Sequence, residues 1–176
     1  MQPLLSQGLV LRAFCDGDAQ EFVHAARESV HTVGRWMSWC TPAFAERDAL
    51  NWFEECRSSL AAQNAHEFGV FSQETGRLLG GAGLNTINHQ NLLCNLGYWV
   101  RESAQGQGVA SRTVQALLPY AFGTLKLQRV EIVVAQGNLP SEAVARRSGA
   151  EFECIAKNRL QLHGKAVSAL VFSITP

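Results

Sequence analysis

The residue types that could do chemistry are concentrated in a glycine-containing segment, residues 105–110, in the second half of the chain. This segment lies between a strand-like run at residues 96–101 and an amphipathic helix that begins near Gly108. A strand, a glycine turn and a helix N-terminus present outward-pointing backbone N–H groups, and the helix dipole favours negative charge there. The segment therefore predicts a socket for a phosphate or pyrophosphate group.

Two familiar phosphate-binding loops do not fit this spacing. A Walker A loop needs a lysine after its last glycine, and no lysine follows Gly108. The dinucleotide-binding fingerprint needs a third glycine at position 111, where this chain has Ser111. The socket is therefore expected to serve a phosphate carrier of another kind.

The pattern Gln-x-x-Gly-x-Ala at residues 105–110 resembles the acyl-CoA-binding motif of the GCN5-related N-acetyltransferase (GNAT) superfamily. Other segments are similar to its RimJ/RimL-like branch, in the same order: Gly-Tyr-Trp-Val at 97–100, Arg-Val-Glu at 129–131 and Asn-x-x-Ser at 138–141. The resemblance implies an acetyl-CoA-dependent N-acetyltransferase that transfers acetyl directly to a primary amine. The implied acceptor is a protein N-terminal α-amine, of the ribosomal-protein type, or a small-molecule amine.

Two other functions stay open at this point. A non-catalytic CoA-binding or sensing module is one, because Asn95, Ser168 and Phe172 replace residues that are common in the family. Transfer of a different acyl group, such as succinyl, is the other. Apart from acetyl-CoA and the amine acceptor, no nucleic-acid or membrane partner is expected, and a homodimer is left open.

The resemblance also assigns roles to residues around the glycine segment. Strand residues Trp99 and Val100 pair with the pantetheine arm of CoA as a neighbouring strand would, and Asn138 contacts the arm from the other side. The N–H of Val100 or Trp99 faces the thioester oxygen and stabilises its developing negative charge. With Ser111 as an added donor, the pyrophosphate is held by the backbone N–H groups of Gln105, Gly106, Gln107, Gly108, Val109 and Ala110.

The departing CoA thiolate needs a proton, and a nearby hydroxyl can supply it. By analogy with cysteine, such a thiol has a pKa of about 8.5. Ser141 occupies the position where the resemblance implies this hydroxyl, so Ser141 is the predicted catalytic acid. Because serine after Asn-Leu-Pro is also a good helix N-cap, a capping role is the alternative for the same residue.

The acceptor side is expected around a tryptophan-rich stretch, Trp36, Met37 and Trp39, which resembles the aromatic loop of the branch. Such a stretch could form an apolar wall that excludes water from the thioester. The alternative interpretation is that these side chains belong to the protein core. The stretch is therefore a predicted acceptor-binding segment, with a place in the core as the alternative.

The general base is left open by the sequence. RimJ/RimL-like proteins often have a glutamate two residues before the Gly-Tyr pair, where this chain has Asn95, and an amide cannot take up a proton. His89, expected near the acceptor, is one candidate base. Glu67 and a chain of water molecules to bulk solvent are the others.

Composition limits the class of protein. With 176 residues, of which 47% are hydrophobic, the chain predicts a single domain over residues 1–176 with a sizeable core. Its formal net charge of zero argues against a general nucleic-acid binder. The five scattered cysteines predict reduced thiols in the cytoplasm, with neither disulfides nor a metal site. No signal peptide or membrane span is expected.

The pattern of apolar residues predicts an α/β fold with a mixed, partly antiparallel central sheet of about seven strands, flanked by about four helices. The first helix is expected at 18–33, with a cap formed by Asp18 and Glu21, and the second begins at Thr41-Pro42. The third begins near Gly108 and kinks or ends near Pro119, and the fourth is expected at 141–148. The resemblance implies the acyl-CoA N-acyltransferase fold, whose fourth and fifth strands splay to admit CoA. The strands are expected at 8–12, 68–72, 77–84, 96–101, 129–135, 151–162 and 166–174, with a loop at 85–91.

Overall fold

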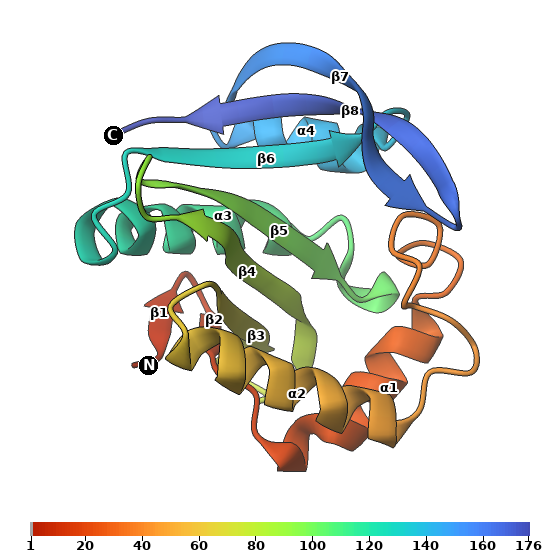
Figure 1. Cartoon of the computed structure of the whole chain (residues 1–176). Coiled ribbons are helices and arrows are strands. Elements are labelled where there is room, and N and C mark those ends of the chain that lie inside the picture. The colour runs from red at the N-terminus through yellow and green to blue at the C-terminus, as the bar shows by residue number, and fades with distance from the viewer. Residues whose placement is uncertain (1) are drawn as a thin grey trace.

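The computed structural model of the protein describes residues 2–176 and contains one sheet of eight strands (Figure 1). The strands are β1 (Leu4–Ser6), β2 (Leu9–Arg12), β3 (His66–Ser72), β4 (Leu78–Asn88), β5 (Leu93–Val100), β6 (Arg129–Ala135), β7 (Glu151–Leu162) and β8 (Lys165–Ile174). They lie in the order β1-β2-β3-β4-β5-β6-β8-β7, and all neighbours are antiparallel except β5 and β6. The predicted α/β class with a mixed, partly antiparallel sheet is confirmed.

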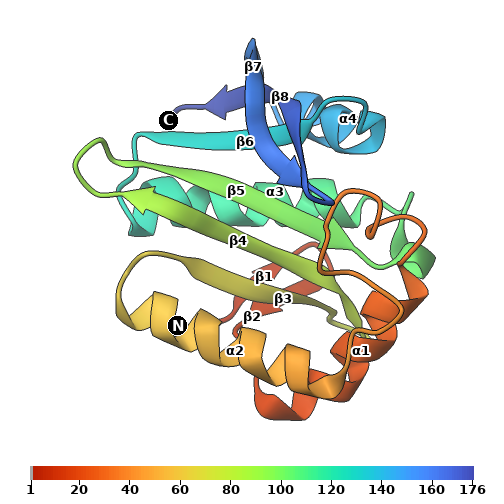
Figure 2. The ribbon, with the colours of Figure 1, turned by 45° about the vertical axis from the view of Figure 1, so that its right-hand side comes forward.

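Helices cover both faces of this sheet (Figures 1 and 2). On one face lie α1 (Ala19–Glu28) and α2 (Glu46–Ala61), which share an aromatic core around Phe22 and Phe53. On the other lie α3 (Val109–Pro119) and α4 (Leu139–Arg147), which pack on the sheet through side chains such as Val114 and Ala145. None of the helices described in residues 2–176 combines the length and apolarity that crossing a membrane requires.

The parallel strands β5 and β6 pair only near their beginnings. Their residue pairs run from Leu93 with Arg129 to Asn95 with Glu131. Beyond that point β5 continues along β4, while β6 continues along β8 (Figure 1). The predicted splaying of these two strands is confirmed. It leaves one edge of β5 beyond Asn95, which we call the open edge, without a strand partner among residues 2–176.

The strand count differs from the prediction by β1, and β4 is longer than predicted. β1 has only three residues, too few to show an alternating pattern in the sequence. β4 runs to Asn88 through part of the predicted loop at 85–91. The register with β5 shifts between Asn85 and Asn88, so a bulge lets this polar segment stay paired.

The first helix ends earlier than predicted. α1 stops at Glu28, whereas the prediction extended it to about Val33. Ser29 leaves helical geometry, and its hydroxyl donates to the Ala25 carbonyl at 2.6 Å. The β-branched residues Val30, Thr32 and Val33 then follow, and such residues are poor helix formers.

Asp18 is the N-cap residue of α1 as predicted, but its side chain makes no capping hydrogen bond to this helix. The Asp18 carboxylate accepts from the backbone N–H of Cys15 at 2.8 Å, so it caps the short 3-10 turn at Asp16–Asp18 that precedes α1. Arg12 also pairs with this carboxylate at 2.7 Å. Asp18 therefore fixes the turn between β2 and α1, and the expected contact with Glu21 does not form.

The second helix begins later than predicted, at Glu46 and not beside Thr41 and Pro42. Thr41 instead closes a turn, because its carbonyl accepts from the N–H of Phe44 at 3.1 Å. The Asp48 carboxylate caps α2 by accepting from the N–H of Ala45 at 2.9 Å. A good capping residue was thus present in the sequence, but seven residues further along the chain.

The ends of the two later helices agree with the sequence. α3 stops at Pro119 and continues as a π-helical turn, Tyr120–Thr124, as the missing N–H of proline predicts. Gly149 follows α4 with a φ of +83°, a left-handed conformation that suits glycine at a helix C-terminus.

Candidate active site

The start of α3 presents a row of backbone N–H groups with no partner in the protein. Among the described residues, no backbone or side-chain acceptor takes the N–H groups of residues 106–111, and the first helical bond runs from Arg112 to Gly108. Gly106 and Gly108 have φ angles of +73° and +75°, and a β-carbon at either position would point into open space. This segment, residues 105–111, has the donor geometry that binding of a diphosphate requires, and we call it the cofactor loop.

Side chains hold the cofactor loop in place. The side-chain amide of Gln105 donates to the Val100 carbonyl at 2.9 Å, and its own backbone N–H donates to the Glu102 carbonyl at 3.1 Å. Gln105 therefore braces the end of β5, and the row of free N–H groups begins one residue later than predicted. Arg112 donates to the Gln107 carbonyl at 3.2 Å and places a positive charge beside the loop.

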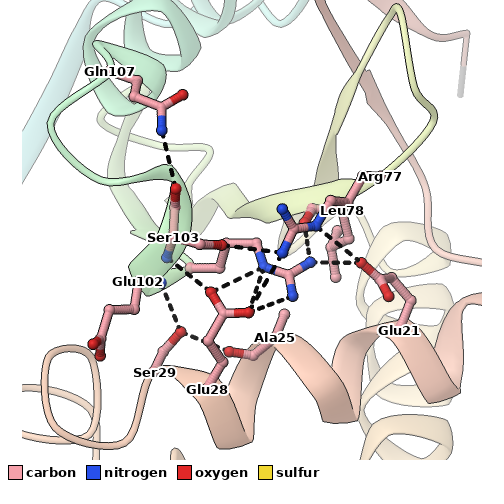
Figure 3. A network of polar contacts seen from close by, with 10 residues as sticks. Glu21, Ala25, Glu28, Ser29, Arg77, Leu78, Glu102, Ser103 and Gln107 are labelled. Atoms are coloured by element: carbon pink, nitrogen blue, oxygen red, sulfur yellow. Dashed lines mark hydrogen bonds and ion pairs between the residues drawn. The ribbon is translucent and has the colours of Figure 1, made fainter.

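Arg101, the last residue before the short turn that leads into the loop, anchors this region to α1 through Glu21 and Glu28, the two carboxylates labelled in Figure 3. Its side chain is only 3% exposed and donates to the carboxylates of Glu21 and Glu28 and to the Leu78 carbonyl. The hydrogen bonds from Arg101 lower the pKa of Glu28 to about 2. Glu28 also accepts from the N–H of Ser103 at 2.8 Å, so one carboxylate joins α1 to the chain that enters the cofactor loop.

The β4–β5 ladder decides which β5 amides face the open edge. The N–H of Arg101 donates to the Leu79 carbonyl at 2.9 Å, and the two strands stay in one register along this stretch. Because backbone groups alternate in direction along an antiparallel strand, the N–H of Trp99 also faces β4. The N–H groups of Tyr98 and Val100 then face the open edge. Val100 thus has the orientation expected of a group that polarises the thioester, and the backbone of Trp99 does not.

Ser141 lies in the first turn of α4, and its hydroxyl contacts β5. Its Oγ is 3.1 Å from the Tyr98 hydroxyl, which also lies 3.1 Å from the Ser141 carbonyl oxygen. Burial raises the pKa of Tyr98 to about 12, so the phenol keeps its proton at neutral pH. Asn138 caps α4 by accepting from the Ser141 N–H at 3.3 Å, so the alternative assignment of Ser141 as the cap is wrong.

A cavity of about 730 Å³ lies on the face of the sheet that α1 and α2 cover. Its lining comes from Phe14 in the link between β2 and α1, from α1, α2 and the segment between them, and from strands β3 to β5. The ring of Trp39 lies 5.4 Å from that of Trp99 and 5.8 Å from that of Phe22, measured between centroids. We call this space the aromatic cavity. It places an apolar wall beside the part of β5 that leads to the cofactor loop.

The charged side chains that line the aromatic cavity are all acidic. Among the described residues that line it there is no lysine, arginine or histidine, and its charged lining residues are Asp48, Glu55 and Glu67. Carboxylates around an aromatic wall favour a cationic ligand, because charge attraction and contact with aromatic rings act together. The cavity therefore suits an ammonium group.

The structure separates the residues predicted for the acceptor side. Met37 and Trp39 line the aromatic cavity, and Trp39 is 36% exposed, so it forms a wall of the cavity rather than part of the core. Trp36 lies instead beside Gly137, between β6 and α4. His89 lies in the exposed turn between β4 and β5, where its ring is 3.0 Å from the Gln63 carbonyl, and it is not among the lining residues.

Comparison with known proteins identifies the family. The acetyltransferase (GNAT) domain family matches the chain over residues 8–151. The chain belongs to the GNAT acetyltransferase family. The predicted membership, and with it the use of acetyl-CoA as the acyl donor of an N-acetyltransferase, is confirmed.

Relatives of this GNAT acetyltransferase include proteins of the RimJ/RimL-like branch, as predicted. The ribosomal-protein-serine acetyltransferase of Escherichia coli is 35% identical over 85 residues, which cover 48% of this chain and 46% of the relative. The [ribosomal protein uS5]-alanine N-acetyltransferase of Escherichia coli is 26% identical and covers 92% of this chain and 84% of its own length. The structure of RimL, a ribosomal L7/L12 alpha-N-protein acetyltransferase in complex with coenzyme A, shares the fold, with a TM-score of 0.90, 22% identity and coverage of 99% and 98%.

Sequence analysis of this acetyltransferase missed Arg101 and Tyr98. Their partners Glu28 and Ser141 lie 73 and 43 residues away along the chain, so no local spacing connects them. An arginine at the end of an apolar strand was the one signal that could have pointed to the anchor. Within residues 2–176, no group of three or more His, Cys, Asp or Glu side chains is arranged to hold a metal ion.

Proposed function

We propose that this GNAT acetyltransferase transfers acetyl from acetyl-CoA to the N-terminal α-amine of a protein. The observation that carries the proposal is the position of β5, which has the cofactor loop at its end and the aromatic cavity on one face. An acyl donor held by the loop and an amine held in the cavity would meet along this strand. The relatives named for serine and for uS5 alanine favour a ribosomal-protein N-terminus that begins with a small residue.

For each step of the transfer, this arrangement supplies a chemical group that can perform it. The free N–H groups of the cofactor loop hold the diphosphate, and the open edge of β5 pairs with the amide-rich pantetheine arm. The N–H of Val100 donates to the thioester oxygen as negative charge develops there. The hydroxyl of Ser141 protonates the departing thiolate. Because no cysteine is among the described lining residues of the aromatic cavity, direct transfer from CoA to the amine is favoured.

The proposal includes a single domain and a cytoplasmic location. One continuous sheet from β1 to β8, together with a family match over residues 8–151, supports a single N-acetyltransferase domain over residues 1–176. The five cysteines are all free, and Cys15 and Cys154 are exposed, as suits a reducing compartment.

The test measures thiol release from acetyl-CoA with peptides that copy ribosomal-protein N-termini beginning with serine or alanine. Each peptide has a control of the same sequence whose N-terminus is already acetylated. We expect thiol release with the free peptides alone, and mass spectrometry should place the new acetyl group on the first residue. Faster turnover of a small amine, faster transfer from succinyl-CoA, or CoA binding without thiol release for any amine would each overturn the proposal.

A further inference from the structure

Glu67 on β3 reaches toward β5 across a pair of glycines. In the register of the sheet Glu67 faces Gly83 on β4, and Gly83 faces Gly97 on β5. The Glu67 carboxylate lies over Gly83, because a β-carbon at Gly83 would come within 1.8 Å of Glu67 Oε2. All three residues line the aromatic cavity. The absence of a side chain at Gly83 is therefore what allows this carboxylate to lie over β4.

The row formed by Glu67, Gly83 and Gly97 ends at the open edge of β5, three residues before Val100. Gly97 directly precedes Tyr98, whose N–H faces the open edge and whose hydroxyl contacts Ser141. Neighbouring strands lie about 4.8 Å apart, so a carboxylate above β4 is about two strand spacings, or about 10 Å, from a thioester held along the open edge of β5. An amine bound above β5, between the carboxylate and the thioester, would pass its proton to Glu67 directly or through one water molecule.

Asparagine side chains orient the Glu67 carboxylate. The Asn85 amide donates to Glu67 Oε1 at 3.1 Å, and the Asn95 amide donates to the Asn85 side-chain oxygen at 2.9 Å. Among the described residues no donor bonds to Glu67 Oε2, so this oxygen is available to a ligand. The side-chain oxygen of Asn95 is buried and also lacks a partner within residues 2–176. Neither asparagine can accept a proton from an ammonium group, which leaves Glu67 as the basic group of this row.

The other carboxylates of the aromatic cavity are placed differently. Asp48 caps α2 by accepting from the Ala45 N–H, and Glu55 is exposed on the same helix. Both belong to the helical side of the cavity, whereas Glu67 belongs to the sheet that carries the open edge. The position of Glu67 thus distinguishes it from the remaining carboxylates.

We infer that Glu67 binds the ammonium group of the acceptor and acts as the general base of the transfer, an inference that rests on the proposed function. Glu67 Oε2 takes one proton from the ammonium nitrogen, and the freed lone pair forms the C–N bond to the thioester carbon. When the C–S bond breaks, its electron pair leaves with sulfur. Sulfur receives a proton from the Ser141 hydroxyl, which regains one from the nitrogen. Glu67 then gives its proton to water.

The surroundings of Glu67 suit this role. Burial raises the pKa of the Glu67 carboxyl, although the hydrogen bond from Asn85 acts in the opposite direction. The charge of Glu55, from α2, raises the pKa of Glu67 further. The other titratable group near it on α2 is Cys56, whose pKa burial raises to about 12. The Cys56 thiol stays uncharged at neutral pH, and a carboxylate of raised pKa accepts a proton more readily.

The substitution Glu67→Gln removes the base and keeps the shape of the side chain. With an N-terminal peptide as acceptor, we expect kcat to fall about 100-fold or more, because general bases typically contribute 10²- to 10⁴-fold. The Kd for acetyl-CoA should not change. Wild-type kcat/KM should rise with pH through the pKa of Glu67 and fall above the pKa of the α-amine, near 8. In E67Q it should rise until the amine itself is neutral.

A second variant displaces the carboxylate without removing it. Gly83→Ala places a methyl group where the flexible end of Glu67 lies, so the carboxylate must move while the backbone can stay. We expect the same loss of kcat with unchanged acetyl-CoA binding. The control is Glu74→Gln, which removes an exposed carboxylate from the β3–β4 turn and should leave kcat at the wild-type value.

The outcomes separate this inference from the proposed function. If wild-type enzyme acetylates the peptides and E67Q keeps both its kcat and the shape of its pH profile, Glu67 is not the base and the proposed function stands. If the wild-type enzyme acetylates no N-terminal amine, the proposed function fails and the role of Glu67 fails with it. Parallel losses in E67Q and G83A, but not in E74Q, would support the assignment.

Discussion

Single side chains in this enzyme connect elements that meet at the open edge of β5. Ser141 and Tyr98 are the clearest pair, because their hydroxyls join α4 to β5 at 3.1 Å. The Tyr98 hydroxyl also contacts the Ser141 carbonyl oxygen. Removing the Ser141 hydroxyl therefore removes a proton donor, but it leaves the hydrogen bond from the Tyr98 hydroxyl to the Ser141 carbonyl, which still joins β5 to α4.

Ser141→Ala is accordingly a test of chemistry more than of folding. With saturating peptide and acetyl-CoA, we expect kcat to fall about 100-fold, within the range of general acid–base catalysis, while the Kd for acetyl-CoA is unchanged. Ser58→Ala, on the exposed side of α2, is the matched serine control and should behave as wild type. Steady-state kinetics and calorimetry measure the two quantities. Full turnover in S141A would remove Ser141 from the mechanism.

At the scale of elements, α1 and the chain entering the cofactor loop depend on each other through Arg101. The buried guanidinium is held by Glu28, and the same carboxylate accepts from Ser103 at the entry to the loop. Because folding lowers the pKa of Glu28 from 4.5 to about 2, this pair stabilises the fold above about pH 4.5. The stabilisation is lost as the pH falls through about 2.

The substitution Glu28→Gln should lower the free energy of unfolding by about 2 kcal/mol at pH 7, the order of a hydrogen bond to a charged group. It should also weaken acetyl-CoA binding, because the entry to the cofactor loop is released. Urea unfolding at several pH values measures the first effect. The difference between E28Q and wild type should shrink below pH 4.5. A difference that is constant down to pH 2 would contradict the role of the ion pair. Glu54→Gln, in an exposed ion pair with Arg57, is the control.

At the scale of the whole molecule, two helical layers and a splayed sheet bring the predicted segments together. The segment between α1 and α2 also contacts the C-terminal hairpin, because the Ser38 hydroxyl accepts from the N–H of His163 at 3.1 Å. That contact joins the wall of the aromatic cavity to the β7–β8 turn. The site is therefore built from both halves of the chain.

Local chemistry explains which parts could be predicted from the sequence. The glycines of the cofactor loop and the end of α3 at Pro119 follow from neighbouring residues, and both predictions agree with the structure. The cap of α2 did not follow, because both Thr41 and Asp48 are good capping residues and tertiary packing decides between them. The row from Glu67 to Gly97 depends on the register of three strands, which no local pattern specifies.

The most direct measurement of the central claim is the affinity of acetyl-CoA for Gly108→Glu compared with Gly76→Glu, by calorimetry. Both glycines have similar φ angles, +75° and +70°, and open space around them, so the substitutions carry similar backbone strain. Only Gly108 belongs to the cofactor loop, and charged hydrogen bonds are worth about 1.5–3 kcal/mol each, so G108E should weaken binding tenfold or more. G76E should bind acetyl-CoA as wild type does. Equal affinity in the two variants would contradict binding of the diphosphate by the cofactor loop.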